Sequence, residues 1–155
     1  MDEKEIILGQ YKVYSEAKEN FINRHFATNR FYFVFSFALL AVIYVFYALA
    51  PALLPPLFTA MFGIVVSVLW WMNIDSYQVL IKVKYAKVLE YLETKLPEQP
   101  FHKEFVETQN AKKDKKIIFA DIQKGFAFMS FFAFSVIFLT IILWGIKQQG
   151  AVVWL

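Results

Sequence analysis

The sequence carries few side chains capable of chemistry, and they are scattered along the chain. It has two histidines, His25 and His102, and no cysteine. Either histidine could join Glu104 or Glu107 as a metal ligand, but two histidines this far apart seldom form a site. The lack of cysteine excludes disulfides and thiolate chemistry, and there is no Gly-rich phosphate loop, HExxH or GxSxG. We therefore expect no enzyme activity, no metal site and no cofactor.

Two residues at the end of a long apolar stretch could act on ions instead. These are Asn73 and Asp75. In a ring of identical subunits, Asp75 would repeat around the axis and attract cations at a pore mouth. The alternative is a solvated interfacial charge that pairs with Arg24 or Arg30. The sequence leaves both interpretations open.

Long uncharged blocks predict that the chain spans a membrane. Hydrophobic residues make up 59% of the chain and aromatic residues 19%, which is unusual for a soluble protein. The 44 residues between Arg30 and Asp75, and the 22 between Lys124 and Lys147, include no Asp, Glu, Lys, Arg or His. A helix crosses the hydrocarbon core with about 20 apolar residues. We expect an all-α membrane protein with three transmembrane helices.

Prolines and tryptophans mark where these spans end. The spans are expected at 31–50, 57–74 and 125–146. The PALLPP turn separates the first two, because three prolines in six residues break a helix. Trp70 and Trp71 close the second span and are typical membrane-interface anchors.

Small residues recur along the second span. Thr59, Gly63 and Ser67 stand four residues apart, a spacing that lets another backbone approach closely. The neighbour could be the first or third span of the same chain. It could also belong to another subunit, or the stripe could surround an axial pore.

The second span is expected to continue as a helix beyond the membrane to Leu96, because no turn signal follows Ile74. Its apolar positions in the cytoplasmic segment 75–124 follow a near-heptad spacing. This predicted oligomer seam consists of Ile74, Tyr77, Ile81, Tyr85, Val88 and Leu92. Additional apolar residues widen the face beyond what one neighbour can cover. The N-terminal helix within 1–30 is one expected neighbour, and a second subunit is the next.

Basic residues predict the topology and a lipid contact. Of the 16 Lys and Arg, five lie in 1–30, none in 31–74, ten in 75–124 and one in the remainder. The N-terminus is therefore expected in the cytoplasm and the tail 147–155 outside. The cluster Lys112, Lys113, Lys115 and Lys116 indicates contact with anionic lipids. It is too short and too close to the membrane to indicate nucleic-acid binding.

The stretch from Leu69 to Phe105 resembles the RipA family of octameric bacterial membrane proteins. The residues that carry the resemblance are Trp70, Trp71, Ser76, Tyr77, Lys84, Glu93, Leu96, Pro97, Phe101, Glu104 and Phe105. It is strong over about 25–106, and Phe105 stands where that family commonly has Trp. The resemblance implies a homo-octamer in a bacterial cytoplasmic membrane, with no established activity.

Two functions follow as hypotheses. The first is a ring-shaped homo-oligomer that forms a channel or pore around the second span and its cytoplasmic extension. The alternative is a scaffold that conducts nothing and organises lipids or partner proteins. In both, the expected partners are further copies of the chain and the lipid bilayer.

Overall fold

The computed structural model describes residues 3–49, 53–81, 87–96, 102–103, 106–107 and 119–152, which contain helices and no strand. The elements are α1 (Glu3–Leu49), α2 (Leu54–Leu80), α3 (Lys87–Glu93) and α5 (Phe119–Val152). Three helices are long and apolar enough to cross a membrane, within Lys4–Leu49, Leu54–Leu80 and Asp121–Lys147. The expected all-α fold with three spans is confirmed.

Helix α1 joins two elements that were expected separately. The N-terminal amphipathic helix and the first span form one uninterrupted helix of 47 residues. No Gly or Pro occurs between Gln10 and Leu49, so nothing in this sequence interrupts the backbone hydrogen bonds. The helix passes from a polar segment into an uncharged one at Arg30 and does not end there.

Helix α2 begins at Leu54, three residues before the start expected from the prolines. Pro55 and Pro56 therefore lie in its first turn. The first backbone N–H groups of a helix have no partner within the helix, so prolines there lose nothing. The first bond of the ladder runs from the Leu57 N–H to the Leu53 carbonyl, at 3.2 Å.

Beyond the span, the expected helix to Leu96 is described only in part. Helix α2 ends at Leu80, residues 82–86 lie outside the described residues, and α3 ends at Glu93. After Glu93 the backbone tightens, because the Lys95 and Leu96 N–H groups donate to the carbonyls of Leu92 and Glu93, three residues back, at 3.2 and 3.0 Å. The Thr94 hydroxyl donates to the carbonyl of Tyr91 at 2.7 Å.

The chain divides into two compact units. One, here called the flanking unit, consists of Met1–Thr28 and Ile74–Ile122. The other, the span unit, consists of Asn29–Asn73 and Gln123–Leu155. The sequence placed the borders of the membrane segments after residues 30, 74 and 124.

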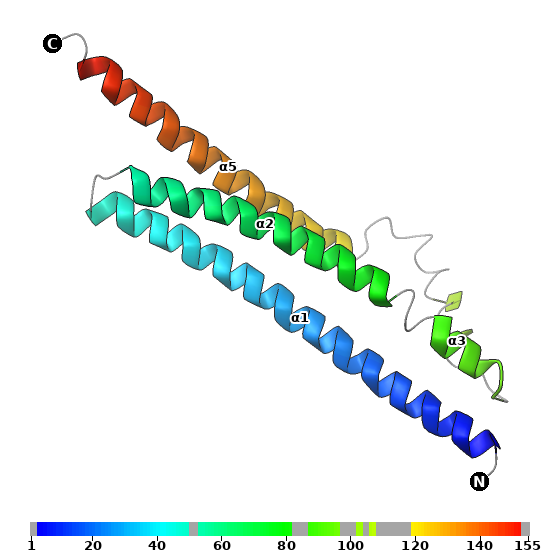
Figure 1. Ribbon diagram of the computed structural model, residues 1–155. Coiled ribbons are helices and arrows are strands. Elements are labelled where there is room, and N and C mark those ends of the chain that lie inside the picture. Colours follow the sequence, from blue (N-terminus) through cyan, green and yellow to red (C-terminus); the bar gives the residue numbers. More distant parts are fainter. Residues whose placement is uncertain are drawn as a thin grey trace. The chain divides into compact units, whose positions relative to one another are not determined.

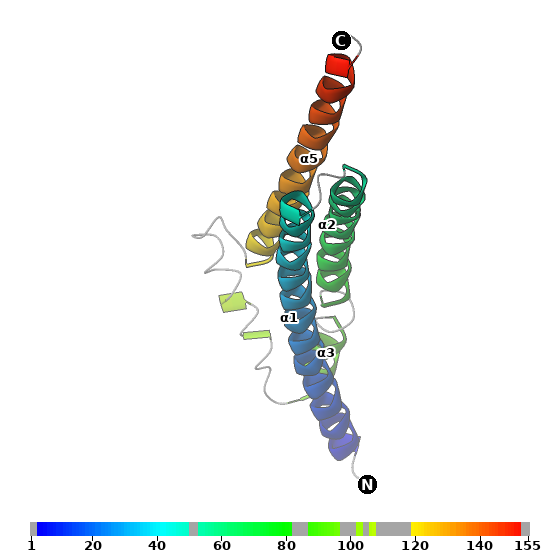
Figure 2. The ribbon, with the colours of Figure 1, turned by 90° about the vertical axis from the view of Figure 1, so that its left-hand side faces the viewer.

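Within the span unit, α1 and α2 run antiparallel, and α5 runs alongside them in the direction of α1 (Figures 1 and 2). Its core consists of Leu39, Ile43, Ala60, Val66 and Phe134. Many other large apolar side chains point outward; Phe132, for example, is 62% exposed. Such an apolar exterior is expected of a protein whose surroundings are lipid or other protein chains.

Candidate functional site

Three serine hydroxyls meet between the helices of the span unit. The Oγ atoms of Ser67 in α2 and Ser130 in α5 lie 3.1 Å apart, and those of Ser130 and Ser36 in α1 lie 3.2 Å apart. Ser67 also donates to the carbonyl of Gly63 at 2.8 Å. The three hydroxyl groups have three protons, which is enough for the three contacts: one to the Gly63 carbonyl and two between the serines. A buried polar link of this kind joins the three helices where few competing partners are available.

The sequence did not single out Ser36 or Ser130 for this role. Ser36 is the one serine or threonine of the first span, and Ser130, Ser135 and Thr140 of the third span stand five residues apart, so they form no polar stripe along one side of the helix. Only the knowledge of which helix faces meet would have paired them with Ser67.

The predicted small-residue stripe lies largely inside the protomer. A Cβ atom added to Gly63 would stand 2.4 Å from the ring of Phe134, so α5 packs directly on this glycine. Ser67 is buried, and Thr59 donates to the carbonyl of Pro55 in its own helix at 2.9 Å. Gly63 and Ser67 therefore face another span of the same chain, which is one of the alternatives left open by the sequence.

The two tryptophans have different surroundings. Trp70 is 3% exposed, its Nε1–H donates to Oδ1 of Asn29 at 2.9 Å, and its ring stacks on Tyr32. It links α2 to α1. Trp71 is 39% exposed, with the Lys124 Nζ 5.6 Å from its ring centroid. Trp71 has the exposure that an interface anchor needs, and the anchor role remains a prediction for both.

The predicted pore-mouth residues lie on α2, with Asn73 in the span unit and Asp75 in the flanking unit. The Oδ1 atom of Asn73 is buried and accepts no hydrogen bond from the described part of the chain. Asp75 is partly exposed. The pore-mouth role of the two remains a prediction.

The predicted oligomer seam contacts its own chain in the flanking unit. Ile74 is fully buried, and the Tyr77 ring lies 4.8 Å from that of Phe21 and 4.7 Å from that of His25, both in α1. Of the remaining seam residues, Leu92 is buried, Ile81 and Val88 are half-buried, and Tyr85 lies outside the described residues. The assembly role of these residues remains a prediction. What the structure shows is that Tyr77 already packs on α1.

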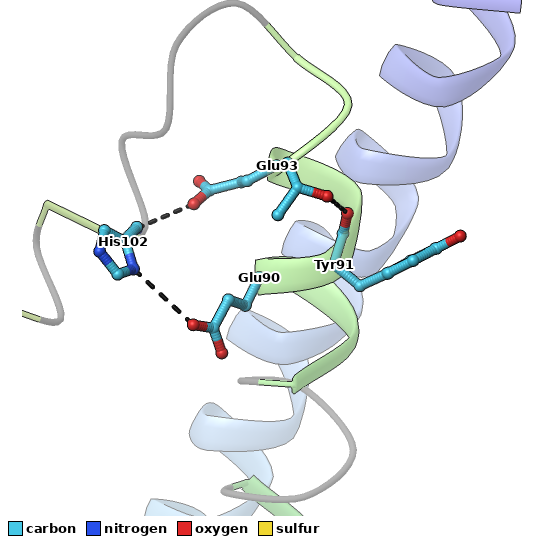
Figure 3. A network of polar contacts seen from close by, with 5 residues as sticks. Glu90, Tyr91, Glu93 and His102 are labelled. Atoms are coloured by element: carbon cyan, nitrogen blue, oxygen red, sulfur yellow. Dashed lines mark hydrogen bonds and ion pairs between the residues drawn. The ribbon is translucent and has the colours of Figure 1, made fainter.

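A buried carboxylate ties the flanking unit together, and Figure 3 shows its contact with His102. Glu93 in α3 is fully buried. Its Oε1 accepts a hydrogen bond from the Tyr11 hydroxyl of α1 at 3.1 Å, and its Oε2 accepts one from the His102 backbone N–H at 2.8 Å. A buried carboxylate is tolerated only where donors meet it. We call Glu93, Tyr11 and His102 the Glu93 clasp.

The clasp was visible in the sequence only in part. Glu93 belongs to the motif that carries the family resemblance, but its contacts were not predicted. It follows Leu89 by four residues on the apolar face of α3, which is an unusual place for a charge. Its neighbour Glu90 is exposed and lies 3.7 Å from Nδ1 of His102, forming an ion pair only when that imidazole is protonated.

The histidines considered as metal ligands have other neighbours. His25 packs on Tyr77, and His102 lies beside Glu90. Among the residues that the structure describes, no three His, Asp or Glu side chains gather in an arrangement that could hold a metal ion. Glu104 and the lysine cluster at 112–116 lie outside those residues.

The span unit also contains an open apolar cleft of about 780 Å³. Aliphatic side chains such as Ile43 and Ile137 line it, together with the aromatic rings of Tyr44, Tyr47 and Trp144. The lining is suited to hydrocarbon and offers few groups for orienting a polar substrate.

Three apolar spanning helices with an apolar exterior define a multi-pass membrane protein. A family model described as "Octameric membrane protein family (8xMP)" matches residues 8–144. The chain belongs to the octameric membrane protein family, so it is a membrane protein that assembles with itself. This agrees with the octameric and membrane aspects of the resemblance; the RipA name is not part of the description. No curated protein and no solved structure matches the chain.

Proposed function

We propose that eight copies of the chain form a ring in a bacterial cytoplasmic membrane and act as a scaffold that conducts no ions. The number eight follows the description of the family. The observation that carries the scaffold role is that the serine and threonine hydroxyls of the spans meet between the helices or are bonded to their own helix.

The spans contain six serine and threonine residues. Three form the serine contact between the helices. The other three donate to the carbonyl four residues earlier in their own helix, namely Thr59 to Pro55, Ser135 to Phe131 and Thr140 to Val136. A ring of such protomers would present mainly Phe, Val, Leu and Met side chains to its axis. Water leaves an apolar constriction of this kind, so lipid is the expected filling.

The proposed orientation rests on charge. Fifteen of the 16 Lys and Arg precede residue 125, and none lies in 31–74. This asymmetry supports a cytoplasmic N-terminus, an external C-terminus, and anionic lipids beside the lysine cluster. A scaffold with these properties would organise lipids or partner proteins at the cytoplasmic face.

A channel is the second candidate, and one observation favours it. Asp75, directly after the last apolar residue of the second span, is partly exposed. It would form a ring of carboxylates if α2 lay nearest the axis. Such a ring attracts cations.

Reconstitution into sealed vesicles distinguishes the two candidates. The scaffold predicts that vesicles loaded with the purified oligomer retain an ion gradient as long as empty vesicles do. A rapid loss of the gradient that the variant Asp75→Asn reduces would establish the channel and refute the scaffold.

A further inference from the structure

We propose that the outward face of α2 is a contact surface for a second copy of this chain. The inference rests on the proposed octamer and assigns one of its interfaces. The surface, called the α2 outer stripe, consists of Phe58, Met61, Val65, Val68 and Met72. Their spacings of three and four residues alternate, so they share one side of the helix.

Helix α2 has two sides with opposite exposure. On the inner side, Ala60 and Trp70 are at most 3% exposed and pack within the protomer. The members of the outer stripe are 44–60% exposed, as follows: Phe58 60%, Met61 48%, Val65 48%, Val68 44% and Met72 58%. The inner side is therefore occupied, and only the outer side of α2 is available to a neighbour.

Lipid alone does not account for the outer side, because α2 stays apolar after the span has ended. Val79 stands seven residues, or one heptad, after Met72 on the same side of the helix and is 59% exposed, and Leu80 is 44% exposed. Both lie beyond Asp75, past the predicted end of the span, where the helix is expected to have left the hydrocarbon. Exposed apolar side chains in such a place indicate contact with protein.

A second copy is the occupant that the molecule itself supplies. The family is octameric, and each subunit of a closed ring must offer two different surfaces to its neighbours. From Phe58 to Val79 the face is about 33 Å long and about 10 Å wide, at about 1.5 Å per residue. A stable interface buries about 800 Å² per partner, so the stripe supplies the centre of a contact that extends onto a second helix.

Two of the four methionines of the chain, Met61 and Met72, belong to the α2 outer stripe. A photoreactive group of native size avoids disturbing the proposed contact. Photo-methionine, a diazirine of about the size of methionine, can replace Met61 and Met72 of the stripe in a Met129→Leu background, and irradiation in native membranes is expected to give a ladder of cross-linked subunits up to the octamer. Adducts with lipid alone would overturn the inference. The control, in which Met61 and Met72 are also replaced by leucine, is expected to lose the ladder; an unchanged ladder would contradict the assignment of this surface.

A bulky apolar substitution provides a second test, since lipid tolerates it and a packed interface does not. Val65→Trp is expected to reduce the number of subunits per particle, whereas Val136→Trp, at an α5 position that is 46% exposed, keeps the octamer. Helix content by circular dichroism checks that both variants fold. An intact Val65→Trp octamer, or equal dissociation of both variants, would overturn the inference. Ion flux through an intact, cross-linked octamer would refute the scaffold and leave this interface standing.

Discussion

The substitution Gly63→Ala tests the packing of α5 on α2. In the structure, a Cβ atom at this position would lie 2.4–2.6 Å from three ring carbons of Phe134. Real Cβ contacts are not that short, so the ring or the helix must move. Phe134 is fully buried in the core of the span unit, and one of the three atoms is its Cγ, so the ring has no free space to swing into.

The expected magnitude combines two opposing effects. Overpacking a well-filled core costs about 1–3 kcal/mol. Replacing Gly by Ala in a helix returns about 0.5–1 kcal/mol. We expect Gly63→Ala to lower the free energy of unfolding by about 1–2 kcal/mol. Gly125→Ala is the matched control, since nothing lies within 4 Å of a Cβ there, and it should gain about 0.5–1 kcal/mol.

The assay is unfolding of the detergent-solubilised protein by titration with sodium dodecyl sulfate, followed by circular dichroism. The double variant Gly63→Ala with Phe134→Leu should recover part of the loss, because the smaller side chain makes room for the new methyl group. If Gly63→Ala proves as stable as Gly125→Ala, the close contact between α2 and α5 is refuted.

Three further substitutions test the polar contacts. Trp70→Phe keeps an aromatic side chain but removes the indole Nε1–H that donates to the buried Oδ1 of Asn29, so the same titration should show a loss of about 1–3 kcal/mol; an unchanged midpoint would rule out the bond. Ser67→Ala should cost about 0.6 kcal/mol, the usual value for a polar contact between membrane helices, and a loss beyond about 2 kcal/mol would mean that the serine contact does more than join helices. Glu93→Gln should speed protease cleavage near α3 while Glu90→Gln, at an exposed site, leaves it unchanged; equal rates would contradict the Glu93 clasp.

Much of the fold could be predicted because its signals are local. The uncharged blocks predicted the three spans correctly, because placing a charged side chain in hydrocarbon costs free energy whichever residues surround it. Helix ends were predicted less well. Pro55 and Pro56 were expected in the turn before α2, and they lie in its first turn. The sequence alone does not distinguish a proline in a first helical turn from a proline in a loop.

The contacts between helices could not be predicted from the sequence, for a different reason. Tyr77 stands in a near-heptad seam, and the pattern shows that it is covered without showing by which helix. The structure places it against Phe21 and His25 of the same chain. The serine contact is harder still, because Ser36, Ser67 and Ser130 come from three separate helices.

The most direct test of the scaffold is native mass spectrometry of the oligomer released from membrane vesicles, which counts subunits and bound lipid in one measurement. The account predicts a particle of eight chains of 18.2 kDa that keeps lipid after detergent removal, because the outward side chains of the spans are apolar. A particle of another size, or an octamer free of lipid, would contradict it.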